Sequence, residues 1–311
     1  MEENRHISVL LDECIENLNI RPDGIYLDGT LGMGGHSYEI ARRLGSGRLI
    51  CIDKDEFALR QGAERLAEFR GKVTFVHSDF RKAADVVRAQ GLNGVDGALF
   101  DLGVSSPQLD DARRGFSYMQ DAPLDMRMDR SSPLTAKDVV NLWDESELSR
   151  ILFEYGEERY ARRIAAAICT RRENEPFETT QQLVDVIRSA MPPAALREKQ
   201  HPAKRSFQAI RIAVNDELGA VEEMMKTVPD VLNPGGRLCV ISFHSLEDRI
   251  VKLGIAKREN GCTCPREAPV CVCGFVRTLR SVTRKPIVSA EAELLANPRA
   301  RSAKLRVAER V

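Results

Sequence analysis

The residues best suited to chemistry gather around a glycine-rich loop near the start of the chain. A loop with four glycines, Gly29–Gly35, follows an apolar run that ends in Asp28. Glycines let a chain turn sharply and let its backbone approach a ligand, because no Cβ stands in the way. The dinucleotide-binding pattern Gly-x-Gly-x-x-Gly does not fit, because with Gly32 and Gly34 as its first two glycines the third would fall at Ser37. The phosphate-loop pattern is absent. Asp28 suits a ligand with a cationic amino group, such as S-adenosylmethionine, although a loop that only reverses the chain is as good an interpretation.

Two further acidic positions follow apolar runs at informative distances. Asp53 ends the run Arg48–Asp53, about twenty residues after the glycines, where such folds place a carboxylate for two ribose hydroxyls. The alternative for Asp53 is a solvated acid at a strand end, which the glycine loop makes the weaker interpretation. Asp79 and Phe80 follow the run Val73–His77 and could contact a base, although Phe80 could equally be a core aromatic.

These residues need a scaffold of alternating strands and helices. The three apolar runs and a fourth at 95–101 alternate with helical patterns, which predicts an α/β doubly wound parallel sheet. Ligands of such sheets lie beyond the carboxyl ends of the strands. The glycine loop, Asp53, Asp79 and the segment Asp101–Gln108 are therefore predicted to share one rim.

The pattern changes in the middle of the chain. Residues 109–205 show helical spacing without a strand signal, which predicts a helical insertion between the two parts of a sheet domain, 1–108 and 206–311. A long amphipathic helix from Phe207 to Met225 and a fifth strand at 237–243 follow. Ser245 is the predicted cap of the next helix, and the last strands are expected within 274–283 and 303–309.

Composition limits the class of protein. The 311 residues are 43% hydrophobic and 30% charged, with a formal net charge of +0, so any nucleic-acid surface must be local. No apolar run reaches membrane-spanning length and the first residues do not begin a signal peptide, which predicts a cytoplasmic protein without a membrane partner. Disulfides are then unexpected, and the single cysteines are predicted to be small core residues: Cys14, Cys51, Cys169 and Cys239.

Four other cysteines form two close pairs, Cys262-x-Cys264 and Cys271-x-Cys273. Four thiols within twelve residues, separated by prolines, suggest a tetrahedral Zn²⁺ site. The spacing is not the usual Cys-x-x-Cys, so free or redox-active thiols are an equal alternative.

Two clusters of basic residues could bind phosphates. One lies where the insertion rejoins the sheet: Arg197, Lys199, Lys204, Arg205 and Arg211. The other is the tail from 275 to 311, with nine basic and three acidic residues. Such patches bind nucleic acid whatever its sequence, although a solvated charged face is the usual alternative.

Seven longer stretches carry a family resemblance over nearly the whole chain, from His6 to Arg310. The chain resembles the RsmH (MraW) family in the stretches Asp28–Ser37, Asp101–Asp110, Gly115–Ser117, Leu124–Met128, Tyr155–Arg159, Ser242–Arg249 and Asn297–Ser302.

The resemblance implies a Rossmann-like class I S-adenosylmethionine-dependent methyltransferase fold with an inserted all-helical domain. It implies methylation of the N4 amine of a decoding-site cytidine, position 1402 of bacterial 16S ribosomal RNA, within the 30S subunit, and no DNA substrate. The cofactor residues of the family fall on seven positions of this chain: Gly34, Gly35, His36, Asp53, Phe80, Asp101 and Gln108.

Catalysis is harder to assign, because the exocyclic amine of cytosine is a poor nucleophile. Amino-group methyltransferases commonly place Asn/Asp-Pro-Pro-aromatic after the fourth strand, whereas this chain has Asp101–Pro107 without the double proline or the aromatic. Asp101, or a nearby backbone carbonyl, is the candidate acceptor for an N–H of the amine, and His244 is a second candidate that could equally make only local hydrogen bonds. Two other functions compete: a non-catalytic RNA-binding assembly factor, which the intact loop disfavours, and a DNA methyltransferase, which the missing motif disfavours.

Overall fold

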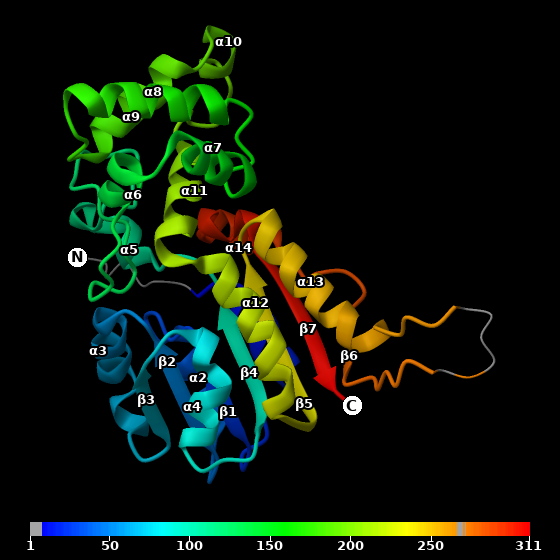
Figure 1. The fold of residues 1–311 in the computed structure, drawn as a ribbon. Coiled ribbons are helices and arrows are strands. Elements are labelled where there is room, and N and C mark those ends of the chain that lie inside the picture. The colour runs from blue at the N-terminus through cyan, green and yellow to red at the C-terminus, as the bar shows by residue number, and fades with distance from the viewer. Residues whose placement is uncertain (1–7, 266–269, 271) are drawn as a thin grey trace. The chain divides into compact units, whose positions relative to one another are not determined.

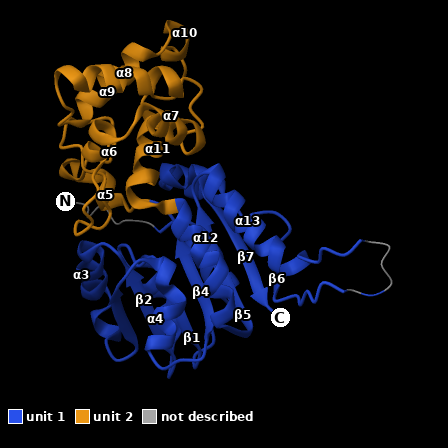
Figure 2. Ribbon diagram, viewed as in Figure 1, with its two compact units in different colours: residues 1–103, 218–311 blue, residues 104–217 orange. Residues whose placement is uncertain are grey.

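The computed structural model describes residues 8–265, 270 and 272–311, and the chain divides into two compact units (Figures 1 and 2). Residues 8–103 and 218–311 form the first unit, and residues 104–217 form the second. Among the described residues, no helix has both the length and the apolar character needed to cross a membrane.

A seven-stranded sheet forms the centre of the first unit (Figure 1). Its strands lie in the order β3-β2-β1-β4-β5-β7-β6. The first five run parallel, while β7 lies antiparallel between β5 and β6. Their bounds are β1 (Ile25–Asp28), β2 (Arg48–Asp53), β3 (Val73–His77), β4 (Val95–Asp101), β5 (Leu232–Ser242), β6 (Leu279–Ser281) and β7 (Lys304–Arg310).

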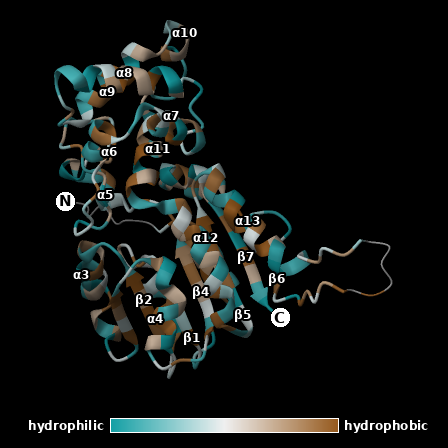
Figure 3. Ribbon diagram, in the orientation of Figure 1, coloured by the Kyte–Doolittle hydropathy of each residue, from teal (hydrophilic) through white to brown (hydrophobic). Residues whose placement is uncertain are grey.

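The parallel strands are apolar because both faces of the sheet are covered. Successive residues of a strand point to opposite faces, and Tyr26 and Leu27 accordingly belong to two different core clusters. In Figure 3 the central strands are mostly hydrophobic. The helices of this unit are α1 (Leu11–Leu18), α2 (Gly35–Arg43), α3 (Glu56–Arg65), α4 (Ala83–Ala89), α12 (Glu217–Thr227), α13 (Ser245–Asn260) and α14 (Glu291–Ala296).

The second unit is helical and has its own apolar core. Its only extended pairing among the described residues is an isolated bridge between Pro123 and Thr179, in agreement with the absence of a strand signal there. Its helices are α5 (Ser106–Asp110), α6 (Ala136–Leu142), α7 (Glu145–Glu154), α8 (Ala161–Asn174), α9 (Thr180–Ala190), α10 (Pro193–Leu196) and α11 (Lys204–Asn215).

Two predictions about the helices need correction. The helix expected from Phe207 to Met225 is broken, because Asp216 adopts a left-handed backbone with φ 47° between α11 and α12. The second unit also extends beyond the predicted insertion 109–205 at both ends, since it holds all of α5 and all of α11. Three of the four single cysteines are buried core residues as predicted, Cys14, Cys51 and Cys239, while Cys169 is half-buried.

Candidate cofactor-binding site

The loop after β1 is held in place by the acid that precedes it. Asp28 is 1% exposed, and its two carboxylate oxygens accept from Ser37 Oγ at 2.6 Å and from the Thr30 N–H at 3.1 Å. Asp28 therefore closes the loop on the first turn of α2, and its contact with a cationic ligand stays a prediction. Burial raises the pKa of Asp28 to about 6.

Glycines of the loop serve distinct structural needs. Gly32 and Gly34 have φ of +52° and +72°, a left-handed backbone that side chains rarely adopt. A Cβ on Gly35 would lie 1.8 Å from Ser8 Oγ, so packing inside the unit already requires that glycine. A Cβ on Gly32 would have only the Thr30 carbonyl oxygen within 4 Å, at 3.9 Å, so the backbone there borders open space that a ligand can approach.

Asp53 lies at the end of β2, beside this loop. Its carboxylate accepts from the N–H groups of Gly32 and Asp55, both at 2.8 Å, and burial raises its pKa to about 6. Each carboxylate oxygen can accept a second hydrogen bond. Asp53 therefore orients the loop and retains the capacity to bind neighbouring hydroxyl groups.

Asp101 ends β4, and its side chain is the least satisfied group of the site. Its N–H donates to Thr30 Oγ1 at 2.6 Å, which places the carboxyl group beside the glycine loop. Oδ1 is buried and has no hydrogen-bond partner within the described structure, while Oδ2 lies 3.9 Å from His36 Nδ1. Burial, and next the negative charges of Asp28 and Glu247, raise the pKa of Asp101 to about 8.

His36 faces inward from the first turn of α2. The imidazole is buried, and its Nε2 lies 3.0 Å from the carbonyl oxygen of Val9. Because a carbonyl oxygen only accepts, Nε2 donates this hydrogen bond, and Nδ1 faces the Asp101 carboxyl group. The side chain of His36 thus positions the N-terminal segment and borders the Asp101 carboxyl group.

Phe80 and Asp79 follow β3 at the same rim. The half-buried ring of Phe80 meets Phe100 edge to face, with centroids 6.0 Å apart, so part of its surface contacts the core and part remains accessible. Asp79 caps the short helix of residues 80–82 by accepting from the Arg81 N–H at 2.9 Å. Its other oxygen lies 3.7 Å from Lys54 Nζ.

His244, not the predicted Ser245, caps α13. Its Nδ1 accepts from the Glu247 N–H at 3.5 Å, and Glu247 Oε2 accepts in return from the Phe243 N–H at 2.9 Å. His244 Nε2 and Glu247 Oε1 lie 3.1 Å apart without the alignment of a hydrogen bond. Nδ1 of His244 thus makes a local contact at a helix start, whereas its buried Nε2 has no hydrogen-bond partner within the described structure. The catalytic role of His244 stays a prediction.

Gln108 belongs to the second unit, apart from the other predicted cofactor residues. Its Oε1 accepts from the Ser105 N–H at 3.0 Å and completes the capping box of α5. The amide oxygen of Gln108 is therefore engaged in starting a helix, and its contribution to the cofactor remains a prediction.

Three residues of the first-unit site were not singled out from the sequence. Thr30 bridges the loop and β4, Ser37 anchors Asp28, and Glu247 contributes negative charge near Asp101. The spacing of His244 and Glu247, three residues apart before an apolar helix, resembles a capping box and could have indicated Glu247. No local pattern reveals the contact of Thr30, because its partner lies 71 residues away.

The structure separates the basic residues of the two clusters into those that form ion pairs and those that are exposed. Arg211 pairs with the buried Glu217 at 2.8 Å, so its assignment to a phosphate-binding surface is wrong. Arg197, Lys199 and Lys204 are exposed. Four of the nine basic residues of the tail form ion pairs within the first unit: Arg277–Glu259, Arg280–Glu309, Lys304–Asp248 and Arg306–Asp248.

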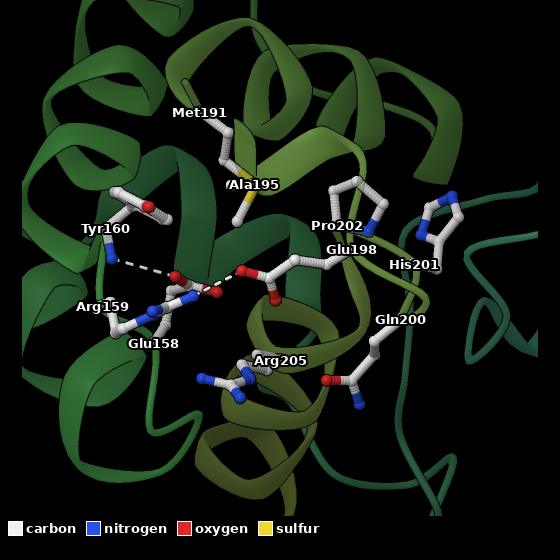
Figure 4. A pocket seen from close by; sticks show the side chains of 10 residues that line it. All are labelled: Glu158, Arg159, Tyr160, Met191, Ala195, Glu198, Gln200, His201, Pro202 and Arg205. Carbon is white, nitrogen blue, oxygen red and sulfur yellow. Dashed lines mark hydrogen bonds and ion pairs between the residues drawn. The ribbon is translucent and has the colours of Figure 1, made fainter. Parts of the chain in front are cut away.

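A surface pocket lies in the second unit (Figure 4). Arg205 and His201 line it, and Arg205 donates to the Glu157 carbonyl at 2.8 Å. Arg159 and Glu198 also line the pocket and pair with each other at 2.5 Å. Charged side chains therefore line the pocket, and two of them form an ion pair.

The strand order with antiparallel β7, the glycine loop after β1 and the acid at the end of β2 define a Rossmann-like class I S-adenosylmethionine-dependent methyltransferase. Residues 3–311 match the model of the MraW methylase family, and the chain belongs to this family. A Brevibacillus brevis protein named ribosomal RNA small subunit methyltransferase H is 56% identical over 307 residues, 98% of each chain. A Clostridioides difficile protein of the same name is 52% identical over 310 residues, covering 99% of this chain and 100% of the relative.

Proposed function

We propose that this protein transfers the methyl group of S-adenosylmethionine to the N4 amine of the decoding-site cytidine, position 1402 of 16S ribosomal RNA, in the cytoplasm. The names of the relatives, which span the same length, support a small-subunit ribosomal RNA substrate. The observation that carries the chemistry is Asp101, whose buried Oδ1 has no partner within the described structure at the carboxyl end of β4.

The cofactor residues divide by the part of the ligand that each suits. Asp53 would accept from the ribose hydroxyls, Phe80 would contact the adenine ring, and Gly32 to Gly35 would allow the close approach of the methionine portion. Bound S-adenosylmethionine would supply an electrophilic methyl group on a sulfonium sulfur. The cation would also favour the ionised form of Asp101, since an opposite charge nearby lowers the pKa of a carboxyl group.

The target amine needs help because its lone pair is delocalised into the cytosine ring. An acceptor for one N–H favours the pyramidal nitrogen that attacks, and positioning contributes much of the remaining rate. We assign this acceptor role to Asp101 Oδ1. The nitrogen lone pair would form the new N–C bond while the S–C bond breaks with its electrons passing to sulfur, and the extra N–H proton would leave to Asp101 or to water.

The test uses the full chain, labelled S-adenosylmethionine and 30S subunits that lack the modification. N4-methylcytidine located at position 1402 by mass spectrometry is the expected product. Cofactor binding without transfer would overturn the substrate and direct the search to another nucleic acid. Absence of cofactor binding would overturn the enzymatic proposal in favour of a non-catalytic RNA-binding factor.

The role of Asp101 requires a separate measurement with Asp101→Asn. Loss of transfer at cofactor concentrations that saturate the variant would support the acceptor role. Equal loss of binding and transfer would assign Asp101 to the cofactor alone, and transfer at the wild-type rate would show that its charge does not matter.

A further inference from the structure

The described residues of the segment between α13 and β6 lie outside the apolar core. None of the described residues from Gly261 to Arg277 is buried. Val270 and Val272 are 70% and 86% exposed. In Figure 1 the described parts of this segment leave the end of α13 and extend away from the sheet before the chain returns to β6.

The base of this segment is fixed by polar contacts. Arg277 pairs with Glu259 at 2.7 Å, and the Thr278 N–H donates to the Arg258 carbonyl at 3.0 Å. Ser281 Oγ donates to the same Glu259 carboxylate at 2.5 Å. The two ends therefore meet beside α13, and any further order in the segment needs a cross-link beyond them.

Three cysteine sulfurs converge in this segment. The Sγ atoms of Cys262, Cys264 and Cys273 lie within 4.8 Å of one another. The Sγ atoms of Cys262 and Cys273 are 3.6 Å apart, whereas a disulfide would hold them at about 2.05 Å. A tetrahedral Zn²⁺ with Zn–S bonds of about 2.3 Å places its sulfur ligands about 3.8 Å apart. The observed separation is close to that geometry.

A backbone donor also points at the cluster. The Val272 N–H donates to Cys264 Sγ at 3.2 Å. Hydrogen bonds to metal-bound sulfur orient the ligand and tune its charge, as other outer contacts of metal ligands do. Three thiolates this close repel one another strongly unless a cation lies between them.

We propose that Cys262, Cys264 and Cys273 bind a structural Zn²⁺ ion that ties the segment between α13 and β6. Zinc favours thiolate ligands in tetrahedral geometry, and a structural site stabilises a loop that buries too little apolar surface to order itself. Cys271, the fourth cysteine of the sequence pattern, lies outside the described residues. The proposal rests on the other three sulfurs and is independent of methyl transfer.

The test measures zinc in the full chain after purification under reducing conditions. We expect about one zinc per chain, and replacement by Co²⁺ should give the visible absorption of a tetrahedral thiolate site. Cys262→Ser and Cys264→Ser should each lower the zinc content several-fold and speed tryptic cleavage between Gly261 and Arg277. Cofactor affinity should stay at the wild-type value, which separates this site from the methyl-transfer site.

Cys169→Ser is the matched control, because Cys169 lies in the second unit on α8, away from the cluster in sequence. It should leave zinc content and cleavage unchanged. Zinc-free reduced protein, zinc that persists in both cluster variants, or a mass deficit of two hydrogens from a disulfide among these cysteines would each overturn the proposal.

Discussion

At the residue scale, the site depends on which acidic side chains are satisfied. Asp28 accepts from Thr30 and Ser37, and Asp53 accepts from Gly32 and Asp55. Asp101 receives no hydrogen bond at Oδ1 within the described structure. All three stand at strand ends, so the sequence pattern does not separate them. Part of the difference arises from the contacts of Ser37 with Asp28 and of Gly32 with Asp53, which no spacing in the sequence indicates.

Ionisation of Asp101 should appear in the affinity for the cofactor. The pKa of Asp101 is raised to about 8 in the ligand-free protein. Below that pH, binding of a cationic ligand therefore requires the carboxyl group to lose its proton. We expect the affinity of the wild type for S-adenosylmethionine, relative to that of Asp101→Asn, to rise between pH 6.5 and 8.5 by at most about tenfold per pH unit. Calorimetric titration of both proteins measures this ratio.

The wild-type affinity is compared with that of Asp101→Asn because the amino group of the ligand also titrates, with an ordinary pKa near 8. Both proteins bind the same ligand, so that contribution cancels. A ratio that does not change with pH would show that binding does not require an ionised Asp101.

The same pKa has a consequence for stability. A carboxyl group whose folded-state pKa is raised binds its proton more tightly in the folded state, so its stabilisation is lost as pH rises toward about 8. The ligand-free wild type should therefore lose stability relative to Asp101→Asn between pH 6 and 8, on the order of 1 kcal/mol because the group is partly screened. Above about pH 8.5 the two curves should run parallel. Denaturant unfolding at each pH measures the difference, and parallel curves throughout would contradict the raised pKa.

At the element scale, the sequence predicted the strands better than the helix boundaries. Buried parallel strands appear as apolar runs, and β1 to β4 lie where these runs predict them. The strand predicted at 237–243 begins earlier, at Leu232, and β7 extends to Arg310, one residue past its predicted range. The helix break at Asp216 was not predicted, because the apolar spacing continues from Val214 to Leu218 across it. The N-cap of α13 was predicted one residue too late, because His244 caps the helix and not Ser245.

The glycine loop is the element whose conformation can be tested directly. Gly32 and Gly91 both have left-handed backbones, with φ of +52° and +71°, so alanine at either position costs about 1–2 kcal/mol in strain. Gly91 lies at the end of α4, and a Cβ there meets nothing within 4 Å. We expect the two alanine variants to lose similar stability, while only Gly32→Ala loses cofactor affinity, by at least tenfold.

Thermal unfolding and cofactor titration of Gly32→Ala and Gly91→Ala provide the comparison. Equal losses of affinity in both variants would mean that general destabilisation explains the effect. Unchanged affinity in Gly32→Ala would place the cofactor away from this part of the loop.

At the scale of the whole molecule, positive and negative charges balance, and several charged side chains form ion pairs with one another. The formal net charge is +0, and the tail pairs several of its cations with Glu259, Glu309 and Asp248. Counting basic residues in the sequence therefore overstated the charge that the tail has available. Which cations remain available depends on tertiary ion pairs, and exposed cations lie in both units: Arg197, Lys199 and Lys204 in the second unit and Arg284, Lys285 and Arg301 in the tail.

The double variant Arg197→Ala/Lys199→Ala should weaken binding to ribosomal RNA. Each lost phosphate contact removes counterion release, so affinity should fall several-fold at low salt, and the slope of log K against log salt should become shallower by one to two units. The control Arg60→Ala/Lys226→Ala removes the same charge from exposed positions of the first unit, whose side chains are 66% and 68% exposed. Filter binding over a salt series measures both. Equal losses in the two double variants would mean that the RNA responds to net charge alone, whereas a loss confined to the first pair would support the second unit as the surface that holds the RNA.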